Sequence, residues 1–484
     1  MFMKSVKWTL LLLVSIFCLS IGYSALNTDL SISGEATLKK GIVYTEKILN
    51  GTDPVLEEPL IPVTIENDGT VRKASIYEEW YKYENSEWAN AVILQDESVV
   101  YRNGDIISEN NIESYFVWIP RFKYKIFDEG LYSSRTEVEN AVETINVIFE
   151  NKNTVASKGT KVGEWLTHPA FTSFNSNGFW VGKFETGYLG ASVPASSQQN
   201  INDSSKVIIK PNVYSWRGIQ VGNAFFTSYN YQRKSDSHMM KNTEWGAVAF
   251  LQHSIYGSHS SVRNNNQSYY LTGYAATVEP TCGYNKESVL CNIHCHDGSC
   301  NYLYNNSIGY TASTTGNISG IYDMSGGAIE YVMGILADST GAPSSGRSSV
   351  YNSGFKGNYT CPTCDGASSP SQTTGYEWPE KKYYDIYTFS ASDQQFGRRI
   401  LGDATGEMGP FGVEISTGST GTQVSNTVGS WYYDMASFVN SSLPWFVRGS
   451  GLNHGINAGM FAFSSTTGAE NLSIGFRIVL TPNE

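Results

Sequence analysis

The chain has 484 residues, of which 13% are aromatic and 16% charged, with 31 Tyr, 11 Trp, 46 Gly and a formal net charge of −12. This length predicts two or three domains, and richness in Tyr, Gly, Ser and Asn with few charges predicts a loop-rich, β-containing extracellular protein. The negative charge excludes nucleic-acid partners, because phosphate contacts need clustered Lys and Arg. Membrane contact is expected only through the N-terminal segment.

Residues 1–26 have the pattern of an export signal. Lys4 and Lys7 precede an apolar run from Trp8 to Ile21, which small residues up to Ala25 follow. A cleaved signal peptide and an uncleaved transmembrane anchor both fit, because the run counted up to Leu26 has about 19 residues, just enough to span a bilayer. In either case the rest of the chain is expected outside the cell, so the protein is predicted to be secreted or displayed at the cell surface.

Six cysteines follow the signal, in two segments rich in Gly, Asn and Ser. An even number in an exported chain predicts disulfides, and the sequence does not fix their pairing. Zinc binding is the alternative, because His294 and His296 lie among thiols and CPTC has zinc-ribbon spacing. The six predicted disulfide cysteines are Cys282, Cys291, Cys295, Cys300, Cys361 and Cys364.

Residues 27–115 are predicted to form a small β-rich module. Short apolar strands are expected over 62–65 and 91–94, and the Asn-Asp-Gly-Thr sequence at 67–70 between them is a turn signal. No residue pattern in this module indicates chemistry, so a spacer or stalk is expected. A second, larger domain is predicted over residues 116–484.

The large domain is predicted to have an α+β fold rich in loops. We expect a helix over 241–251, because apolar residues recur there at helical spacing behind Asn242 or Thr243 as the N-cap. The stretch 445–480 reads as two or three short strands that frame exposed loops.

Four segments resemble a known family. GFWVGKFE, KNTEWGAVAFL, GIYDMSGGAIEYV and the C-terminal RGSG…AGMF…GFRIVL resemble, in this order, segments of the formylglycine-generating-enzyme domain, the sulfatase-modifying-factor family. This family has a variant of the C-type lectin fold, so the resemblance implies a lectin-like domain over residues 116–484. It also implies that the family's opening strand lies at 178–185 and its first helix within 221–231. The N-terminal GYSALNTDLSISGEATL also resembles the signal peptides of Gram-positive secreted matrix proteins.

The resemblance does not extend to the family's chemistry. Its oxygen-dependent enzymes use two C-terminal cysteines that bind copper and attack a substrate thiol, and the corresponding interval 450–474 contains no cysteine. Neither Ser nor Asn can replace a thiolate in either role. Another branch holds iron with histidines from an added helical bundle, and residues 27–115 do not have that pattern. We therefore predict no catalytic residue; the rival hypothesis is a related oxidoreductase that uses Cys361 and Cys364.

Calcium is the one cofactor that the resemblance suggests. The family's GN.WE turn supplies Asn and Glu oxygens to calcium, and this chain keeps Glu330 but has Gly327 in place of the Asn. A hard cation wants six or more oxygen ligands, so Glu330 is a weak calcium candidate. The competing interpretation is a carboxylate hydrogen-bonded to backbone amides. No other cofactor is predicted.

The C-terminal stretch is the predicted binding surface, because lectin-like folds present ligands from loops on a rigid sheet. Framework residues such as Arg448, Phe461 and Arg477 alternate there with small polar or adaptable ones. Trp431, Tyr432 and Tyr433 are additional candidate aromatic anchors. The predicted ligand-binding residues are Trp445, Leu452, Asn453, His454, Ile456, Asn457, Ser464, Ser465, Thr466, Glu470, Asn471 and Ser473.

These patterns predict an exported or cell-surface protein that binds a protein or glycan ligand through its C-terminal loops. The layout also resembles the variable region of proteins that diversity-generating retroelements target, and a near-copy of this segment beside a reverse-transcriptase gene would test that idea. A structural matrix or pilus-like subunit is the other alternative, suggested by the signal segment.

Overall fold

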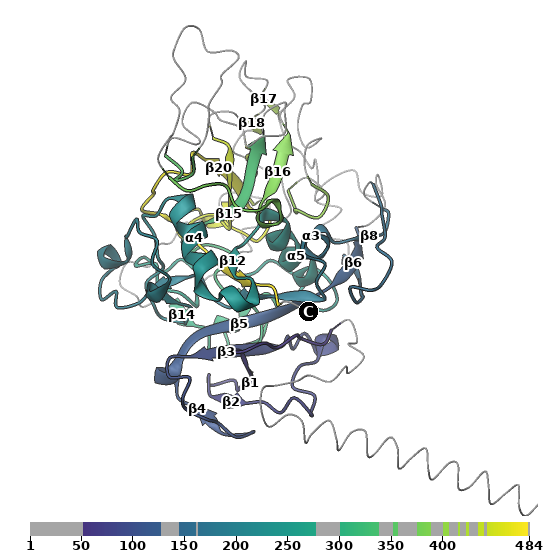
Figure 1. Ribbon diagram of the computed structural model, residues 1–484, viewed down its shortest axis with the longest axis vertical. Helices are drawn as coiled ribbons and strands as arrows, with labels where there is room; N and C mark the ends of the chain where they lie inside the picture. The colour runs from purple at the N-terminus through teal and green to yellow at the C-terminus, as the bar shows by residue number, and fades with distance from the viewer. Residues whose placement is uncertain are drawn as a thin grey trace, which may run out of the picture. The chain divides into compact units, whose positions relative to one another are not determined.

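The computed structural model of the chain is a mixture of α and β structure with many strands and few helices (Figure 1), which confirms the α+β prediction in this general sense. The chain divides into two compact units, Met1–Leu49 and Asn50–Glu484, and all described residues lie in the second. The predicted signal or anchor at 1–26 and the six predicted disulfide cysteines lie outside the described residues. The structure describes residues 52–126, 145–160, 163–276, 301–337, 352–356, 375–388, 400–405, 415–416, 423–424, 434–439 and 443–482.

The larger sheet has eight strands, and its neighbouring strands pair antiparallel. Its longest strand, β5, is buried on both faces over residues 114–120, as the apolar run at 115–120 requires. In spatial order the strands are β12 (His238–Met239), β22 (Ile478–Leu480), β9 (Gly178–Gly182), β5 (Ile112–Pro120), β3 (Asn90–Leu94), β1 (Ile61–Ile65), β2 (Val71–Lys73) and β4 (Ile106–Ile107).

The predicted module at 27–115 is not separate in this sheet. The expected strands at 62–65 and 91–94 exist as β1 and β3, but both belong to the sheet that contains β9 and β22. The expected boundary after residue 115 falls inside β5, where Ala91 pairs with Phe116. The prediction of a boundary there is wrong because β3 covers one edge of β5, and pairing between distant strands leaves no local signal in the sequence.

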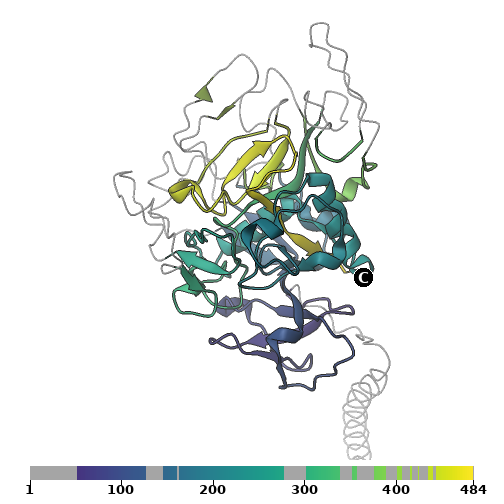
Figure 2. The same cartoon turned by 90° about the vertical axis from the view of Figure 1, so that its left-hand side faces the viewer.

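The smaller sheet has five strands and is built around β15. Strands β16 and β21 pair with β15 in parallel, β19 pairs with it antiparallel, and β20 follows β19. In Figure 2 the yellow C-terminal strands lie beside the green β15. The strands are β16 (Asp385–Thr388), β15 (Ile329–Ala337), β19 (Trp445–Arg448), β20 (Phe463–Thr466) and β21 (Ile474–Phe476).

Short strands form the remaining sheets. One has three strands, and three others have two strands each. They are β7 (Asn146–Phe149), β6 (Phe122–Lys125) and β8 (Leu166–Thr167); β10 (Gly187–Tyr188) with β11 (Val207–Ile208); β13 (Tyr274–Ala276) with β14 (Asn301–Leu303); and β17 (Ile415–Ser416) with β18 (Gln423–Val424).

Two predicted helices are confirmed as α4 (Val221–Tyr231) and α5 (Asn242–Gln252), and a short helix, α3 (Pro169–Phe174), precedes them. The N-cap position of α5 is Lys241, one residue before the predicted Asn242. The Glu244 carboxylate accepts the Lys241 amide at 2.8 Å, and Asp385 in β16 accepts the Thr243 amide at 2.8 Å. No helix in the described ranges is long and apolar enough to cross a membrane.

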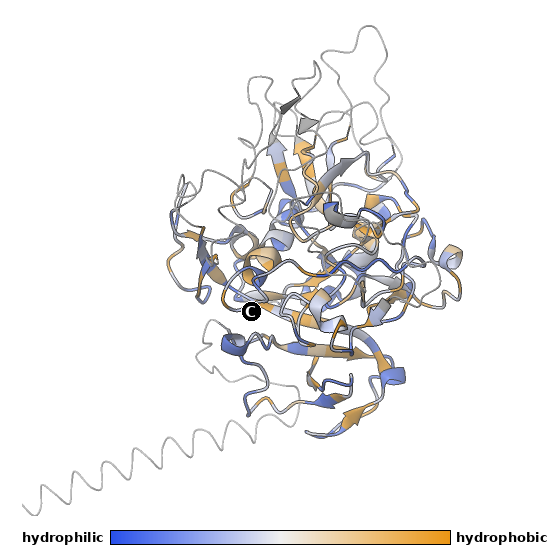
Figure 3. Ribbon diagram, turned by 180° about the vertical axis from the view of Figure 1, so that it is seen from behind, coloured by the Kyte–Doolittle hydropathy of each residue, from blue (hydrophilic) through white to orange (hydrophobic). Residues whose placement is uncertain are grey.

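The hydrophobic core follows the central strands. Figure 3 shows orange, apolar residues concentrated in the strands and blue, polar ones in many connecting loops. Trp118 in β5 and Trp180 in β9 are fully buried, with ring centroids 5.3 Å apart. Trp88 and Asn90 join this core to later parts of the chain, because the Trp88 indole donates to the Tyr256 carbonyl at 2.7 Å and the Asn90 amide donates to the Ser319 carbonyl at 2.8 Å.

A truncated chain that starts at residue 112 should therefore not fold cooperatively. Removing β1 to β4 would expose one edge of β5 and part of the apolar surface around Trp118. A chain that starts at residue 52 is the control and should keep one cooperative thermal transition, measured by near-ultraviolet circular dichroism. An equally cooperative transition in the shorter chain would restore the separate-module interpretation.

Candidate functional site

The C-terminal stretch runs between the two sheets. It enters through β19 in the smaller sheet, continues through the 3₁₀ helix η11 (Gly455–Asn457) and β20, and returns to β15 as β21. One residue later the chain joins the larger sheet as β22. The exposed loops between β19 and β21 therefore start and end on strands of the smaller sheet.

The predicted framework residues of this stretch are buried. Arg448 and Arg477 have no exposed surface, and Ala458, Phe461 and Phe476 are also inside. The sequence pattern therefore separated inward from outward positions correctly at these residues. Their burial leaves the intervening positions to form the surface.

Most predicted ligand-binding residues lie on or near that surface. Trp445 is the exception, because it is fully buried and stacks on Trp378 at 5.8 Å and Phe355 at 5.8 Å. Trp445 is therefore part of the hydrophobic core beneath the loops and is not an exposed anchor for a ligand. Ile456 lies in η11, and its side chain is outside the described part, as are Trp431, Tyr432 and Tyr433. The exposed or half-buried members are Leu452, Asn453, His454, Asn457, Ser464, Ser465, Thr466, Glu470, Asn471 and Ser473.

The backbone of the loops is fixed by hydrogen bonds to the rest of the domain. The Leu452 amide donates to the Gly327 carbonyl at 3.0 Å, and the Asn264 side chain donates to the Gly455 carbonyl at 2.7 Å. The Trp245 indole donates to the Met460 carbonyl at 2.7 Å. The loop is thus preformed, and a ligand that binds it does not have to order it.

His454 stabilises the turn at the start of this loop. Its Nδ1 accepts the Gly451 amide at 3.1 Å and lies 2.9 Å from the Ser450 hydroxyl. An accepting Nδ1 leaves the proton on Nε2, and desolvation by the surrounding loop lowers the pKa of His454. The imidazole is therefore neutral at pH 7. It stabilises the loop through hydrogen bonds and adds no charge to the surface.

Arg448 is a buried cation that is held by neutral oxygens. Its guanidinium donates to the Asn242 side chain at 3.1 Å and to the Asp403 carbonyl at 3.0 Å. Burial lowers the pKa of Arg448 to about 10, so it stays protonated at neutral pH. Its donors are directed into the core, where an external ligand does not reach them.

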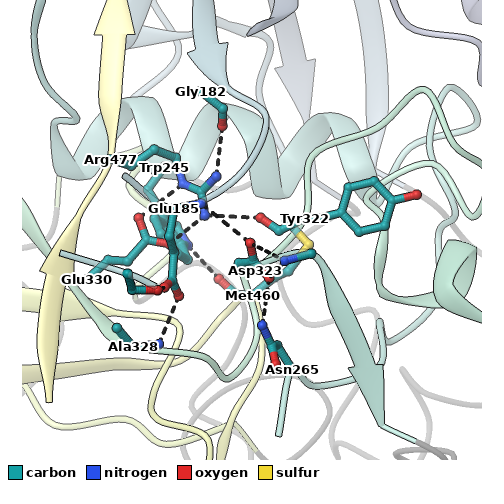
Figure 4. A network of polar contacts seen from close by, with 12 residues as sticks. Gly182, Glu185, Trp245, Asn265, Tyr322, Asp323, Ala328, Glu330, Met460 and Arg477 are labelled. Atoms are coloured by element: carbon teal, nitrogen blue, oxygen red, sulfur yellow. Dashed lines mark hydrogen bonds and ion pairs between the residues drawn. The ribbon is translucent and has the colours of Figure 1, made fainter. Parts of the chain in front are cut away.

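Arg477 is the residue that connects the two sheets (Figure 4). It lies between β21 and β22, and two of its nitrogens donate to the Glu330 carboxylate of β15 at 3.0 and 2.6 Å. A third donates to the Gly182 carbonyl at the end of β9 at 2.7 Å, and the Tyr322 carbonyl accepts another bond at 3.0 Å. This planar fork of donors matches a carboxylate and two carbonyls at once.

Glu330 therefore does not stand as an open calcium ligand. Both of its carboxylate oxygens bond Arg477, and its side chain is buried. Gly327 also leaves no room for a side chain, because a Cβ there would lie 2.3 Å from the Glu185 carboxylate oxygen. No cluster of three or more His, Cys, Asp or Glu side chains suited to a metal ion occurs in the described part of the chain. The weak calcium assignment of Glu330 is corrected to an internal ion pair.

Two further buried carboxyls lie beside this pair. Asp323 accepts the Gly273 amide at 2.8 Å and the Asn265 side chain at 2.8 Å, and Glu185 accepts the Ala328 amide at 2.9 Å and the Ser215 hydroxyl. Burial raises the pKa of both carboxyls, and the neighbouring Asp323 and Glu330 carboxylates raise the pKa of Glu185 further, well above its usual value. Glu185 is therefore the member of the cluster that holds a proton most readily.

Several supporting residues were not singled out from the sequence. Lys183 is buried and donates to Asn90 at 2.9 Å and to the Ile318 and Gly320 carbonyls at 2.7 and 2.8 Å. Arg217 is buried and donates to the Leu472 carbonyl beneath the predicted surface. Only the GFWVGKFE resemblance pointed near Lys183, and no sequence signal indicated that residue 217 contacts residue 472.

Comparison with models of protein families and with curated proteins gave no match.

The Arg477→Lys substitution should lower the free energy of unfolding by about 3–5 kcal/mol, because one ammonium cannot replace the fork and Glu330 would keep a partly unpaired buried charge. Urea unfolding measures this change. Lys356→Met is the control, since its pair with Glu377 at 2.7 Å is exposed and should contribute no more than about 1 kcal/mol. Similar effects of the two substitutions would show that Arg477 does not join the sheets energetically.

The Glu185→Gln substitution should flatten the pH dependence of stability. Folding raises the pKa of the Glu185 carboxyl above its value in the unfolded chain, near 4.5. The contribution of this group to the free energy of unfolding is therefore complete below pH 4.5 and is lost as the pH rises through the pKa of the folded state. Gln keeps the acceptor for Ala328 and has no charge to bury, so its advantage over the parent should grow from pH 4 to pH 9 in urea unfolding. The exposed Glu377→Gln is the control, and parallel curves for parent and Glu185→Gln would contradict the assignment.

Proposed function

We propose that this protein is an exported or cell-surface binding protein that recognises a protein or glycan through the loop surface at residues 452–473. One observation carries the proposal: adaptable side chains face outward on a backbone that buried residues hold in place. Such a surface can change its side chains without loss of the fold, which is how binding loops on rigid scaffolds work.

The proposed scaffold is the lectin-like, sulfatase-modifying-factor type of domain, without catalysis. Its support is the order of the four quoted segments, together with the absence of cysteine from residues 450–474. The contacts of Arg448 and Arg477 agree with this, since both guanidiniums bond groups inside the protein. Diversification of the loop by a retroelement remains part of the proposal, with the genomic test given above.

Replacing six side chains of this surface with alanine should weaken ligand binding and leave the fold intact. The substituted residues are Leu452, Asn453, Asn457, Ser464, Ser465 and Thr466, all exposed or half-buried. Binding of residues 27–484 to arrays of glycans and synthetic peptides is the measurement, and thermal unfolding reports the fold. Hits of the parent chain should weaken by about tenfold or more in the loop variant.

A matched control carries the same types of change away from this surface. Its substituted residues are Val100, Asn85, Asn103, Ser98, Ser108 and Thr64, all exposed. The control should bind like the parent. Equal binding by the loop variant, or equal loss in both variants, would count against a ligand site at residues 452–473.

A further inference from the structure

We propose that the loop surface extends onto a second patch, formed by Val193, Ile201, Tyr269 and Leu472 around the Glu470 carboxylate, and that this patch binds a basic and aliphatic segment of a protein partner. The inference rests on the proposed function and specifies its ligand as a protein. Only Glu470 belongs to the binding residues predicted from the sequence.

The four apolar side chains of the patch are open to solvent. Leu472 is 59% exposed, Val193 51%, Tyr269 48% and Ile201 38%. Isolated exposed apolar residues are ordinary, but several grouped on one surface and rimmed by polar groups indicate an interaction site.

Arg217 brings the distant segments of the patch together. One guanidinium nitrogen donates to the Leu472 carbonyl and another to the Pro194 carbonyl at 2.9 Å, next to Val193. The Tyr270 ring, next to Tyr269, lies over the same guanidinium at 3.8 Å. Three chain segments therefore meet on one buried cation, and each carries an exposed apolar side chain beside its contact.

The fourth segment is attached through Asn200. Its side chain donates to the Glu470 carboxylate at 2.9 Å and accepts the Gln220 amide at 2.9 Å, so Ile201 follows a residue bonded directly to Glu470. The adjacent strand-like contacts agree, because Gln198 pairs with Arg217 and Ile219 pairs with Asn471. These two bridges connect the backbone at residue 198 to that at residue 217, and the backbone at residue 219 to that at residue 471.

Tyr270 lies in a strained turn. Its φ is +58°, a left-handed conformation that is strained for an aromatic residue. The Ser215 amide bonds its carbonyl at 2.9 Å, and its hydroxyl donates to Ser473 at 3.2 Å. Such strain persists only where surrounding contacts enforce it, and here those contacts hold the Tyr269–Tyr270 turn against the loop at Ser473.

The chemistry of the patch favours a protein over a glycan. Branched aliphatic side chains such as Val193, Ile201 and Leu472 gain by covering other apolar groups, whereas sugar hydroxyls would be desolvated against them at a cost. Glu470 is exposed and has no Lys or Arg within ion-pair distance among the described residues, and Asn200 fixes its orientation. An exposed, oriented carboxylate on a chain of net charge −12 complements a Lys or Arg of the partner.

The test uses residues 27–484 and immobilised synthetic peptides of three compositions, basic–aliphatic, acidic–aliphatic and basic–polar, beside a glycan array. Basic–aliphatic peptides should bind best, and added salt should weaken their binding by screening Glu470. The Leu472→Asp and Tyr269→Asp substitutions should each reduce this binding by about tenfold or more. Glu470→Gln should remove most of the salt dependence.

The matched control is Ile255→Asp. Ile255 is 62% exposed, and its substitution introduces the same charge away from the patch. It should bind like the parent, and thermal unfolding of all variants should be similar. Binding only to glycans, binding to none of the peptide sets, or unchanged binding by Leu472→Asp and Tyr269→Asp would overturn the inference. If Leu472→Asp binds normally while the six-residue loop variant does not, the inference fails and the proposed function stands.

Discussion

The contact between Arg477 and Glu330 determines how the two main sheets meet. Arg477 is the single residue between β21 and β22, so the chain passes from the smaller sheet to the larger one at this point. Its guanidinium bonds β15 through Glu330 and the end of β9 through the Gly182 carbonyl. Because an unpaired charge at this depth is costly, the two sheets have one favourable arrangement, and the C-terminal loops inherit their position from it.

The same principle recurs around the core. Lys183, Arg217 and Arg448 are buried and directed at carbonyl or amide oxygens, with no carboxylate within ion-pair distance among the described residues. Each of these side chains donates hydrogen bonds to loop carbonyls that no helix or sheet hydrogen bond would satisfy. This explains how a domain with many loops can present a fixed surface: the long cationic side chains hold loop carbonyls in place from the inside. Side chains that point outward are then free to vary.

Local patterns predicted the elements better than the contacts between them. Short apolar runs located β1 and β3, helical spacing located α5, and the alternation of buried and open positions in the C-terminal stretch was largely correct. Trp445 was misjudged because an aromatic residue can anchor a ligand or a core with equal ease, and its stacking on Trp378 depends on a distant segment. The Glu330 assignment failed for a related reason, since its partner Arg477 is 147 positions away along the chain.

The sequence by itself determined the mixed α and β character of the chain, several of its strands and helices, and most of the C-terminal positions that face outward, because these depend on composition and short-range periodicity. Only the tertiary structure decided that residues 61–107 complete the larger sheet, that Glu330 pairs with Arg477, and that Val193, Tyr269 and Leu472 meet around Arg217. Each of these outcomes joins segments far apart in the chain. Their free energy comes from burial and hydrogen bonding across those segments, and no local pattern encodes it.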